Sequence, residues 1–214
     1  MRFNRILAVV GAIAVSFAGM SNATAQLSSS SNNGYSYGSP VTINQGDKIV
    51  VSDHACTLTY IGDDYAITAG HCGNTGEKVY TSTGSLIGKV ELNVFGNDTD
   101  VSIIGINPNV NGYNAYSGNA IGSFESINTD DELCQYSRNS GNVMCTDDYY
   151  VYSGLVIMET TAIAGDSGGP VWIKDGNLVG LISYEKSIIS TGGQVYKAVG
   201  VSELQPTINK YNNL

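Results

Sequence analysis

Residues 164–170 of the 214-residue chain read AGDSGGP, and an apolar run, Val171–Trp172, begins directly after them. Glycines on both sides of Ser167 allow the backbone to turn tightly and to bring its N–H groups close to a ligand. Because an apolar run follows, the turn joins strands and does not have the strand–turn–helix form of another large class of serine sites. A nucleophilic serine needs an exposed hydroxyl and nearby N–H donors. Such a turn is also common without any chemistry, so a partner base decides between the two interpretations.

A base is available in residues 68–72, which read TAGHC and end the apolar run 65–68. A histidine at a strand end, next to a cysteine, is well positioned for proton transfer because its ordinary pKa lies close to neutral pH. An isolated histidine is more often an ordinary surface or core residue. The only other histidine, His54, lies in 52–55 (SDHA) without a motif around it. We therefore predict that His71 is the base for Ser167.

Taken together, TAGHC at 68–72 and GDSGGP at 165–170 resemble the two signature segments of the chymotrypsin family of serine proteases. The likeness runs from about residue 41 to residue 205 and keeps the family's order of His, Asp and Ser. Residues 134–145 resemble a hairpin of the secreted bacterial branch, the streptogrisin and α-lytic type. The resemblance implies an all-β fold of two six-stranded antiparallel β-barrels, with the active site in the cleft between them.

The resemblance also implies a third site residue, an aspartate that orients His71. Asp98 and Asp100 both lie in 97–104 (NDTDVSII), and we prefer Asp100 because a small residue and apolar residues follow it. Choosing Asp98 would place Asp100 at a buried position, where an unpaired carboxylate is costly. The bacterial branch often has Asn-Asp here, which resembles 97–98 and keeps Asp98 as the alternative.

On the same likeness, acyl transfer occurs at Ser167, the backbone N–H groups of Gly165 and Ser167 form the oxyanion hole, and no cofactor or metal is needed. The predicted substrate pocket comprises Thr161, Ala162, Ser183 and Glu185. Thr161 replaces the pocket aspartate of trypsin-type members, so we expect a neutral P1 residue, small or medium and apolar. A carboxylate at Glu185 could narrow the pocket or attract a basic side chain, and the alternative is that Glu185 is a solvated surface residue at the strand end.

Two broader expectations follow. The function is that of a secreted serine endopeptidase acting on proteins or peptides, and the alternative is a restricted or inactive homologue that binds a partner or acts like a toxin. Asp166, before the predicted nucleophile, is expected to pair with Arg138 or with a newly cut amino terminus. Gln135 stands closest to the position at which the bacterial branch often has an arginine.

Four cysteines remain after the first 25 residues: Cys56, Cys72, Cys134 and Cys145. An even number in an exported chain predicts disulfides, with three possible connectivities from the residues alone. The resemblance implies the pairs Cys56–Cys72 and Cys134–Cys145. A zinc site is disfavoured because the chain has no C-x-x-C pair and only two histidines.

The amino-terminal segment 1–25 begins with two arginines, continues with an apolar run and ends in ATA, which predicts a cleaved signal peptide. Its apolar run is too short to span a membrane. Residues 26–40 are rich in Ser, Asn and Gly and predict a flexible leader or short pro-segment, followed by a protease domain over 41–214. We therefore expect an extracellular, monomeric protein without a membrane association after cleavage.

The charge and the hydrophobic patterning agree with an exported, all-β protein. Without residues 1–25 the chain has 8 basic and 19 acidic residues, a net charge of −11, which disfavours nucleic-acid and anionic-membrane partners. Short apolar or alternating runs separated by turn residues predict strands, and 202–210 predicts a short helix. The predicted strands are 48–51, 57–61, 65–68, 87–94, 101–106, 150–158, 171–173, 178–183 and 195–199.

Overall fold

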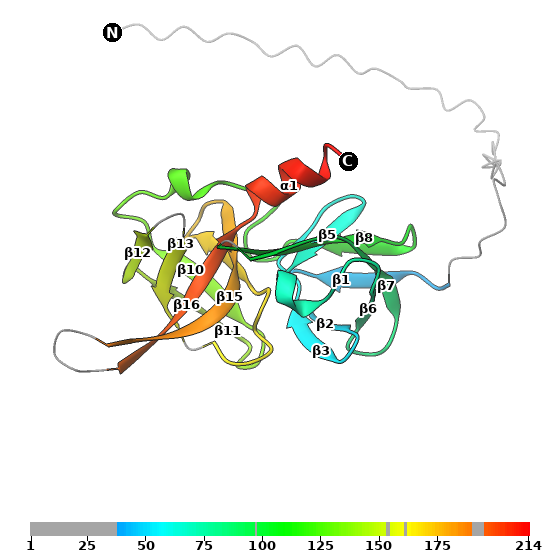
Figure 1. Ribbon diagram of the computed structural model, residues 1–214, viewed down its shortest axis with the longest axis horizontal. Helices are drawn as coiled ribbons and strands as arrows, with labels where there is room; N and C mark the ends of the chain where they lie inside the picture. Colours follow the sequence, from blue (N-terminus) through cyan, green and yellow to red (C-terminus); the bar gives the residue numbers. More distant parts are fainter. Residues whose placement is uncertain (1–37, 97, 153–154, 161, 190–194) are drawn as a thin grey trace, which may run out of the picture. The chain divides into compact units, whose positions relative to one another are not determined.

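The computed structural model describes residues 38–214 except 97, 153–154, 161 and 190–194 (Figure 1). The predicted signal peptide, and the predicted leader up to residue 37, lie outside the described residues. About half of the described residues are in strands. Nearly all of these strands lie in two large antiparallel sheets, as predicted, and one short α-helix lies near the carboxyl terminus. No helix among the described residues is long and apolar enough to cross a membrane.

The first sheet has seven strands in the order β3-β2-β6-β7-β8-β5-β4, all antiparallel. Its strands are β2 (Lys48–Val51), β3 (His54–Thr57), β4 (Tyr60–Ile61), β5 (Tyr65–Thr68), β6 (Lys78–Thr81), β7 (Leu86–Gly96) and β8 (Thr99–Ile106). A short parallel pair, β1 (Val41–Asn44) with β9 (Val110–Tyr113), lies outside this sheet.

The second sheet also has seven strands, in the order β11-β10-β14-β15-β16-β13-β12. Its strands are β10 (Leu133–Ser137), β11 (Asn142–Thr146), β12 (Tyr149–Tyr152), β13 (Leu155–Glu159), β14 (Pro170–Ile173), β15 (Leu178–Ile189) and β16 (Val195–Glu203). The predicted single strand 150–158 is therefore two strands that pair with each other.

The strand count differs from the predicted six per barrel for a structural reason. In each sheet the two edge strands are neighbours in the sequence: β3 and β4 are separated by Leu58–Thr59, and β11 and β12 by Asp147–Asp148. A sheet whose two edges are consecutive pieces of one segment must curl until those edges meet. Each seven-stranded sheet is thus a barrel of six chain segments, one of which is interrupted where it changes partner.

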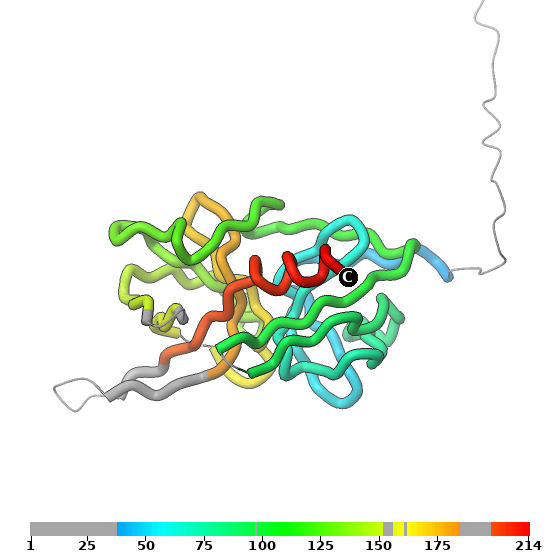
Figure 2. Tube along the Cα trace, turned by 45° about the horizontal axis from the view of Figure 1, so that its top comes forward, coloured from blue at the N-terminus to red at the C-terminus, as the bar shows by residue number. Residues whose placement is uncertain are grey.

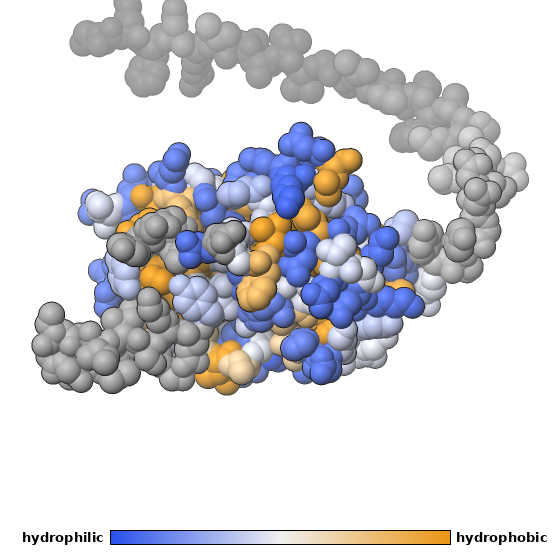
Figure 3. All heavy atoms as spheres, viewed as in Figure 1, coloured by the Kyte–Doolittle hydropathy of each residue, from blue (hydrophilic) through white to orange (hydrophobic). Residues whose placement is uncertain are grey.

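Two clusters of buried hydrophobic side chains fill the interiors of the two curled sheets. One gathers the inward residues of the first sheet, such as Ile49, Ile67 and Ile103, and the other those of the second, such as Leu133 and Val156. The face drawn in Figure 3 mixes hydrophilic and apolar surface.

The carboxyl-terminal helix joins the two halves of the chain. Leu204, which directly precedes α1 (Gln205–Tyr211), and Ile208, within α1, both belong to the first cluster. Figure 2 shows α1 lying along β8. The end of the chain therefore packs on the first barrel although its preceding strand belongs to the second.

Candidate active site

The candidate site is a cavity of about 520 Å³ lined by residues from both sheets. The first sheet and its η1 turn (Gly70–Cys72) contribute His71, Phe95 and Asp100. The second sheet and its loops contribute Ala162, Ile163, Ala164, Ser167, Ile182, Ser183, Tyr184 and Val199. The structure thus brings His71, Asp100 and Ser167 to one cavity, although they are far apart in the sequence.

His71 is held by Asp100 through two hydrogen bonds. The His71 ring Nδ1 lies 2.7 Å from Asp100 Oδ2, and the His71 backbone N–H donates to Asp100 Oδ1 at 2.7 Å. Asp100 is 5% exposed, whereas the His71 side chain is 34% exposed. The Nδ1 edge of the imidazole is therefore anchored in the protein, and the rest of the ring reaches the cavity.

The charge on Asp100 is stabilised despite its burial. Burial alone raises the pKa of Asp100, but hydrogen bonds from the His71 ring and the Ser183 hydroxyl, the attraction to His71 and the His71 N–H outweigh it. The pKa of Asp100 consequently lies below its ordinary value of 3.8. At neutral pH the carboxylate is ionised and can stabilise a positive charge on the imidazole.

Gly70 makes this contact possible by its lack of a side chain. A Cβ at Gly70 would lie 2.8 Å from the Val94 carbonyl oxygen and 2.9 Å from Asp100 Oδ1. Distances this short do not occur for real Cβ atoms, so Asp100 approaches the His71 backbone only because residue 70 is glycine.

The alternative residues lie elsewhere. Asp98 is exposed with φ +62° at the turn between β7 and β8. His54 has a 62% exposed side chain, whose ring nitrogen is 3.3 Å from the Asp53 carboxylate. Neither residue lines the cavity.

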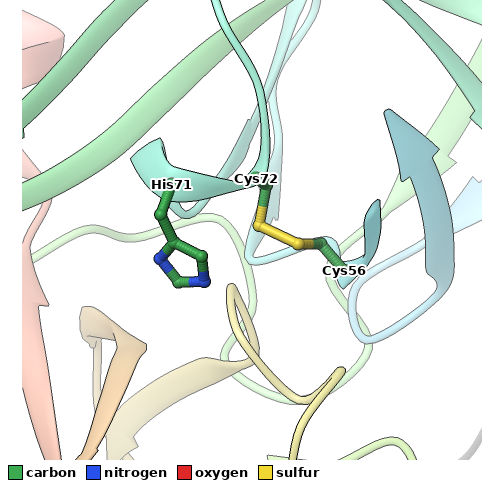
Figure 4. Close-up of side chains that lie close together, drawn as sticks. All are labelled: Cys56, His71 and Cys72. Carbon is green, nitrogen blue, oxygen red and sulfur yellow. A yellow bond between two sulfur atoms is a disulfide. The ribbon is translucent and has the colours of Figure 1, made fainter. Parts of the chain in front are cut away.

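The disulfides are Cys56–Cys72 and Cys134–Cys145. Figure 4 shows the His71 ring and the Cys56–Cys72 disulfide extending separately from the same η1 turn. Cys56, His71 and Cys72 would form a group of three metal-ligand atoms within 4.8 Å of one another. Because both sulfurs are consumed by the disulfide, this group cannot act as a thiolate metal site.

The turn that carries Ser167 is bonded to the first sheet. The Thr57 N–H donates to the Ser167 carbonyl at 2.9 Å, the Thr57 hydroxyl donates to the Gly165 carbonyl at 2.9 Å, and the Thr59 hydroxyl donates to the Gly168 carbonyl. The motifs alone did not indicate Thr57 and Thr59. Thr57 is 108 residues from Gly165, so no local sequence pattern could have found it.

Gly168 permits this close approach between the sheets. It has φ +82°, and a Cβ there would lie 2.3 Å from the Thr57 carbonyl oxygen. Both the conformation and the space therefore require glycine at this position.

Of the predicted oxyanion donors, Gly165 lies in a type II turn over 163–166 and Ser167 directly follows that turn. The Asp166 N–H donates to the Ile163 carbonyl at 3.0 Å, and Gly165 has φ +95° at the third turn position, where a type II turn requires a positive φ. Within the part of the chain that the structure describes, the N–H groups of Gly165 and Ser167 donate no hydrogen bond to a protein group.

Asp166 pairs with neutral groups instead of the expected cation. It is fully buried, and its carboxylate accepts hydrogen bonds from the Ser137 hydroxyl, the Asn139 N–H and side-chain amide, and the Ile163 N–H. Arg138 donates to Asn139 Oδ1 and the Gly165 carbonyl. Gln135 bonds to Thr160 and the Glu159 carbonyl. The expectation that Asp166 pairs with Arg138 is therefore wrong for the described residues.

The predicted pocket residues have different positions. Ala162 and Ser183 line the cavity. Thr161 lies outside the described residues, and the Glu185 side chain is likewise outside the description, although its backbone pairs with Val199. Sequence reasoning missed the other apolar lining residues, Phe95, Ile182, Tyr184 and Val199, because only the folding of two distant strands and a hairpin brings them together.

Comparisons with known proteins agree with the fold. A glutamic-acid-specific serine protease that uses a histidine triad in substrate binding superposes with a TM-score of 0.58 at 19% identity, covering 79% of this chain and 98% of its own. A Glu endopeptidase solved in complex with MPD gives 0.51 at 16% identity, with 79% and 89% covered. No family model and no curated protein matches the sequence. The chain thus has the two-barrel fold of the chymotrypsin-type serine proteases.

Proposed function

We propose that this protein is a secreted serine endopeptidase in which Ser167, His71 and Asp100 act as a catalytic triad. The observation that carries the proposal is the 2.7 Å contact between His71 Nδ1 and the buried Asp100 carboxylate, at a cavity that Ser167 also lines. Export is inferred from the signal-like segment 1–25 and agrees with two disulfides in the chain.

The chemistry follows from the protonation of His71. In the neutral ring, a proton on Nδ1 donated to Asp100 leaves Nε2 free to accept a proton. Ser167 Oγ attacks the scissile carbonyl carbon while its proton passes to Nε2, and His71 then gives that proton to the leaving amine. Water hydrolyses the resulting acyl-enzyme with the same base. The N–H groups of Gly165 and Ser167 would stabilise the oxyanion.

A neutral P1 residue fits the described part of the pocket. Ala162, Ile182 and Val199 give it apolar walls, and among the described lining residues His71 is the only group able to become positively charged. One of the two similar structures is described as a glutamic-acid-specific serine protease and the other as a Glu endopeptidase, so P1 Glu belongs in the test panel beside Ala, Val, Leu, Phe, Lys and Arg.

The test is fluorophosphonate labelling of the protein secreted into the medium, followed by the P1 panel. Wild type should be labelled, Ser167→Ala and His71→Ala should not, and Asp100→Asn should lose about 10⁴-fold in kcat. If all of these variants are labelled as fast as wild type, the assignment of Ser167, His71 and Asp100 as a catalytic triad is disproved. A folded wild type that resists labelling would favour the restricted, partner-binding homologue, and preferred cleavage after Lys, Arg or Glu would refute the neutral P1 preference.

A further inference from the structure

The hairpin loop between β10 and β11 contacts the turn that precedes Ser167 through two side chains: Arg138 donates to the Gly165 carbonyl, and Asn139 makes the shorter hydrogen bonds. Its Nδ2 donates to the Ala164 carbonyl at 3.1 Å and to Asp166 Oδ1 at 2.8 Å, and its backbone N–H donates to Asp166 Oδ1 at 3.0 Å. Asn139 therefore touches two of the four residues of the 163–166 turn.

The orientation of the Asn139 amide is fixed by partners of opposite kinds. Arg138 Nη2 donates to Asn139 Oδ1 at 2.8 Å, so this end must be the oxygen. The two partners on the other end, a carbonyl and a carboxylate, are acceptors only, so this end must be the NH₂ group. A flipped amide would face three partners of the wrong kind.

The bond to Ala164 determines which way the next N–H points. The peptide between Ala164 and Gly165 is trans, because the described residues contain no cis peptide. In a trans peptide the C=O and the N–H point in opposite directions. Since the Ala164 carbonyl points to Asn139, the Gly165 N–H points away from Asn139.

Asp166 anchors the other end of the same turn without a cation. Each carboxylate oxygen has two neutral donors: Asn139 contributes both to Oδ1, while Ser137 and Ile163 donate to Oδ2 at 2.7 and 3.1 Å. Four hydrogen bonds offset the cost of burying this carboxylate, which is 0% exposed.

From these contacts we propose that Asn139 is a positioning residue for the oxyanion hole: it holds the Ala164 carbonyl outward so that the Gly165 N–H faces the cavity beside Ser167. The proposal rests on the proposed function, because an oxyanion forms only if Ser167 is acylated. Asn139 touches neither the substrate nor the reacting atoms. When it is lost, the Ala164–Gly165 peptide can rotate and withdraw one oxyanion donor, whereas the Asp166 anchor retains three of its four donors.

The test uses the secreted full chain and a fluorophosphonate probe, because no peptide substrate need be known. The phosphonyl oxygen of the probe requires the same donors as the oxyanion, so a misplaced Gly165 N–H lowers the labelling rate constant kinact more than it weakens the initial probe affinity KI. We expect Asn139→Ala to lower kinact at least 10-fold, and to change KI less than 3-fold.

Two variants separate positioning from a general loss of stability. Ser137→Ala removes a buried donor to Asp166 but leaves the Asn139–Ala164 bond, so it should lower the melting temperature at least as much as Asn139→Ala and keep kinact within 3-fold of wild type. Asn142→Ala changes an exposed asparagine of the same hairpin and should match wild type in both properties.

Asn139→Asp is nearly isosteric and keeps the backbone bond, but it replaces the Nδ2 donor with an acceptor. It should lose at least as much kinact as Asn139→Ala, and it provides the measurement if the alanine variant does not fold. The inference is overturned if wild type is labelled and the Asn139 variants are labelled equally fast, or if Ser137→Ala loses as much kinact as Asn139→Ala. A wild type that is not labelled removes the proposed function and the inference with it.

Discussion

The hydroxyl of Ser183 on β15 donates a 2.5 Å hydrogen bond to Oδ2 of Asp100 on β8. Asp100 Oδ2 also accepts from the His71 ring, so the second barrel contacts the carboxylate that orients the imidazole of the first. The two sheets are therefore connected at the candidate site itself.

Ser183→Ala should raise the pKa of Asp100, because it removes one of the hydrogen bonds that lower it. We expect about a 10-fold loss of kcat/KM near neutral pH, in line with the loss of a charge-assisted hydrogen bond. Asp100 has a lowered pKa in the folded state, so its stabilising contribution is present above its ordinary value of 3.8 and is lost as pH falls through the lowered value. Urea unfolding should therefore separate variant and wild type at pH 7, with a difference that disappears in strong acid.

The matched control for this variant is Ser102→Ala. Ser102 is also a buried serine, two residues from Asp100 on β8, but its hydroxyl has no hydrogen-bond partner among the described residues. It should retain the activity and stability of wild type. A persistent stability difference between Ser183→Ala and wild type below the pKa of Asp100 would argue against a charge effect.

Gly70→Ala should inactivate the protein. The new Cβ would meet Asp100 Oδ1 and the Val94 carbonyl at less than 3 Å, so Asp100 must move away from the His71 N–H. We expect a fluorophosphonate labelling rate at least 100-fold lower, with a lower melting temperature. Gly38→Ala, where a Cβ meets nothing within 4 Å, should behave as wild type; an active Gly70→Ala would mean that the Asp100 contact is dispensable.

Thr57→Val should loosen the turn that carries Ser167. The substitution keeps the size and β-branching of Thr57 but removes its hydrogen bond to the Gly165 carbonyl, at an expected cost of about 1–2 kcal/mol in the free energy of unfolding. The labelling rate should fall with it, since Gly165 belongs to the predicted oxyanion hole. The control is Thr207→Val, because the buried Thr207 hydroxyl has no partner among the described residues. Equal effects of the two substitutions would contradict the prediction.

Removal of the Cys56–Cys72 disulfide should cost more than removal of Cys134–Cys145. The first closes the longer loop, with a sequence separation of 16 against 11, and Cys72 directly follows His71 in η1. The second joins residues that already face each other in the β10–β11 ladder. We expect the Cys56→Ser/Cys72→Ser variant to lose about 3 kcal/mol of stability in urea unfolding together with most of its labelling. Comparable losses of stability and labelling in both double variants would show that the Cys56–Cys72 disulfide beside His71 has no special role.

Activity should not depend on a free amino terminus. Asp166 already has four donors, and the described start of the chain is bonded elsewhere, with Gly38 and Ser39 accepting from the Asn109 side chain. Secreted forms that begin at residue 26 or 38, with or without a Gly-Ser extension, should be labelled at rates within 3-fold of one another. A form that gains activity only when its terminus is cut would indicate that a new amine displaces the Asn139 and Ser137 donors.

The sequence by itself determined much about this protein, because the deciding features are local. The Gly-rich run 164–170 and the TAGHC run 68–72 depend on backbone geometry within a few residues, and the short apolar runs predicted β2 and β5 with their observed bounds. Strands with exposed faces escaped prediction. β11 and β9 are largely exposed, so neither shows the apolar alternation that marks a half-buried strand.

The tertiary structure alone decided how these pieces meet. The choice between Asp98 and Asp100 as the partner of the His71 ring depended on which carboxylate the β7–β8 hairpin turns inward. The Thr57 bonds to the Ser167 turn, the Ser183 bond to Asp100, and the Ser137 and Asn139 bonds to Asp166 all join segments 25 or more residues apart. Such contacts arise because two barrels close against each other and every buried carboxylate and carbonyl must find a donor there. No local pattern in the chain encodes which donor that will be.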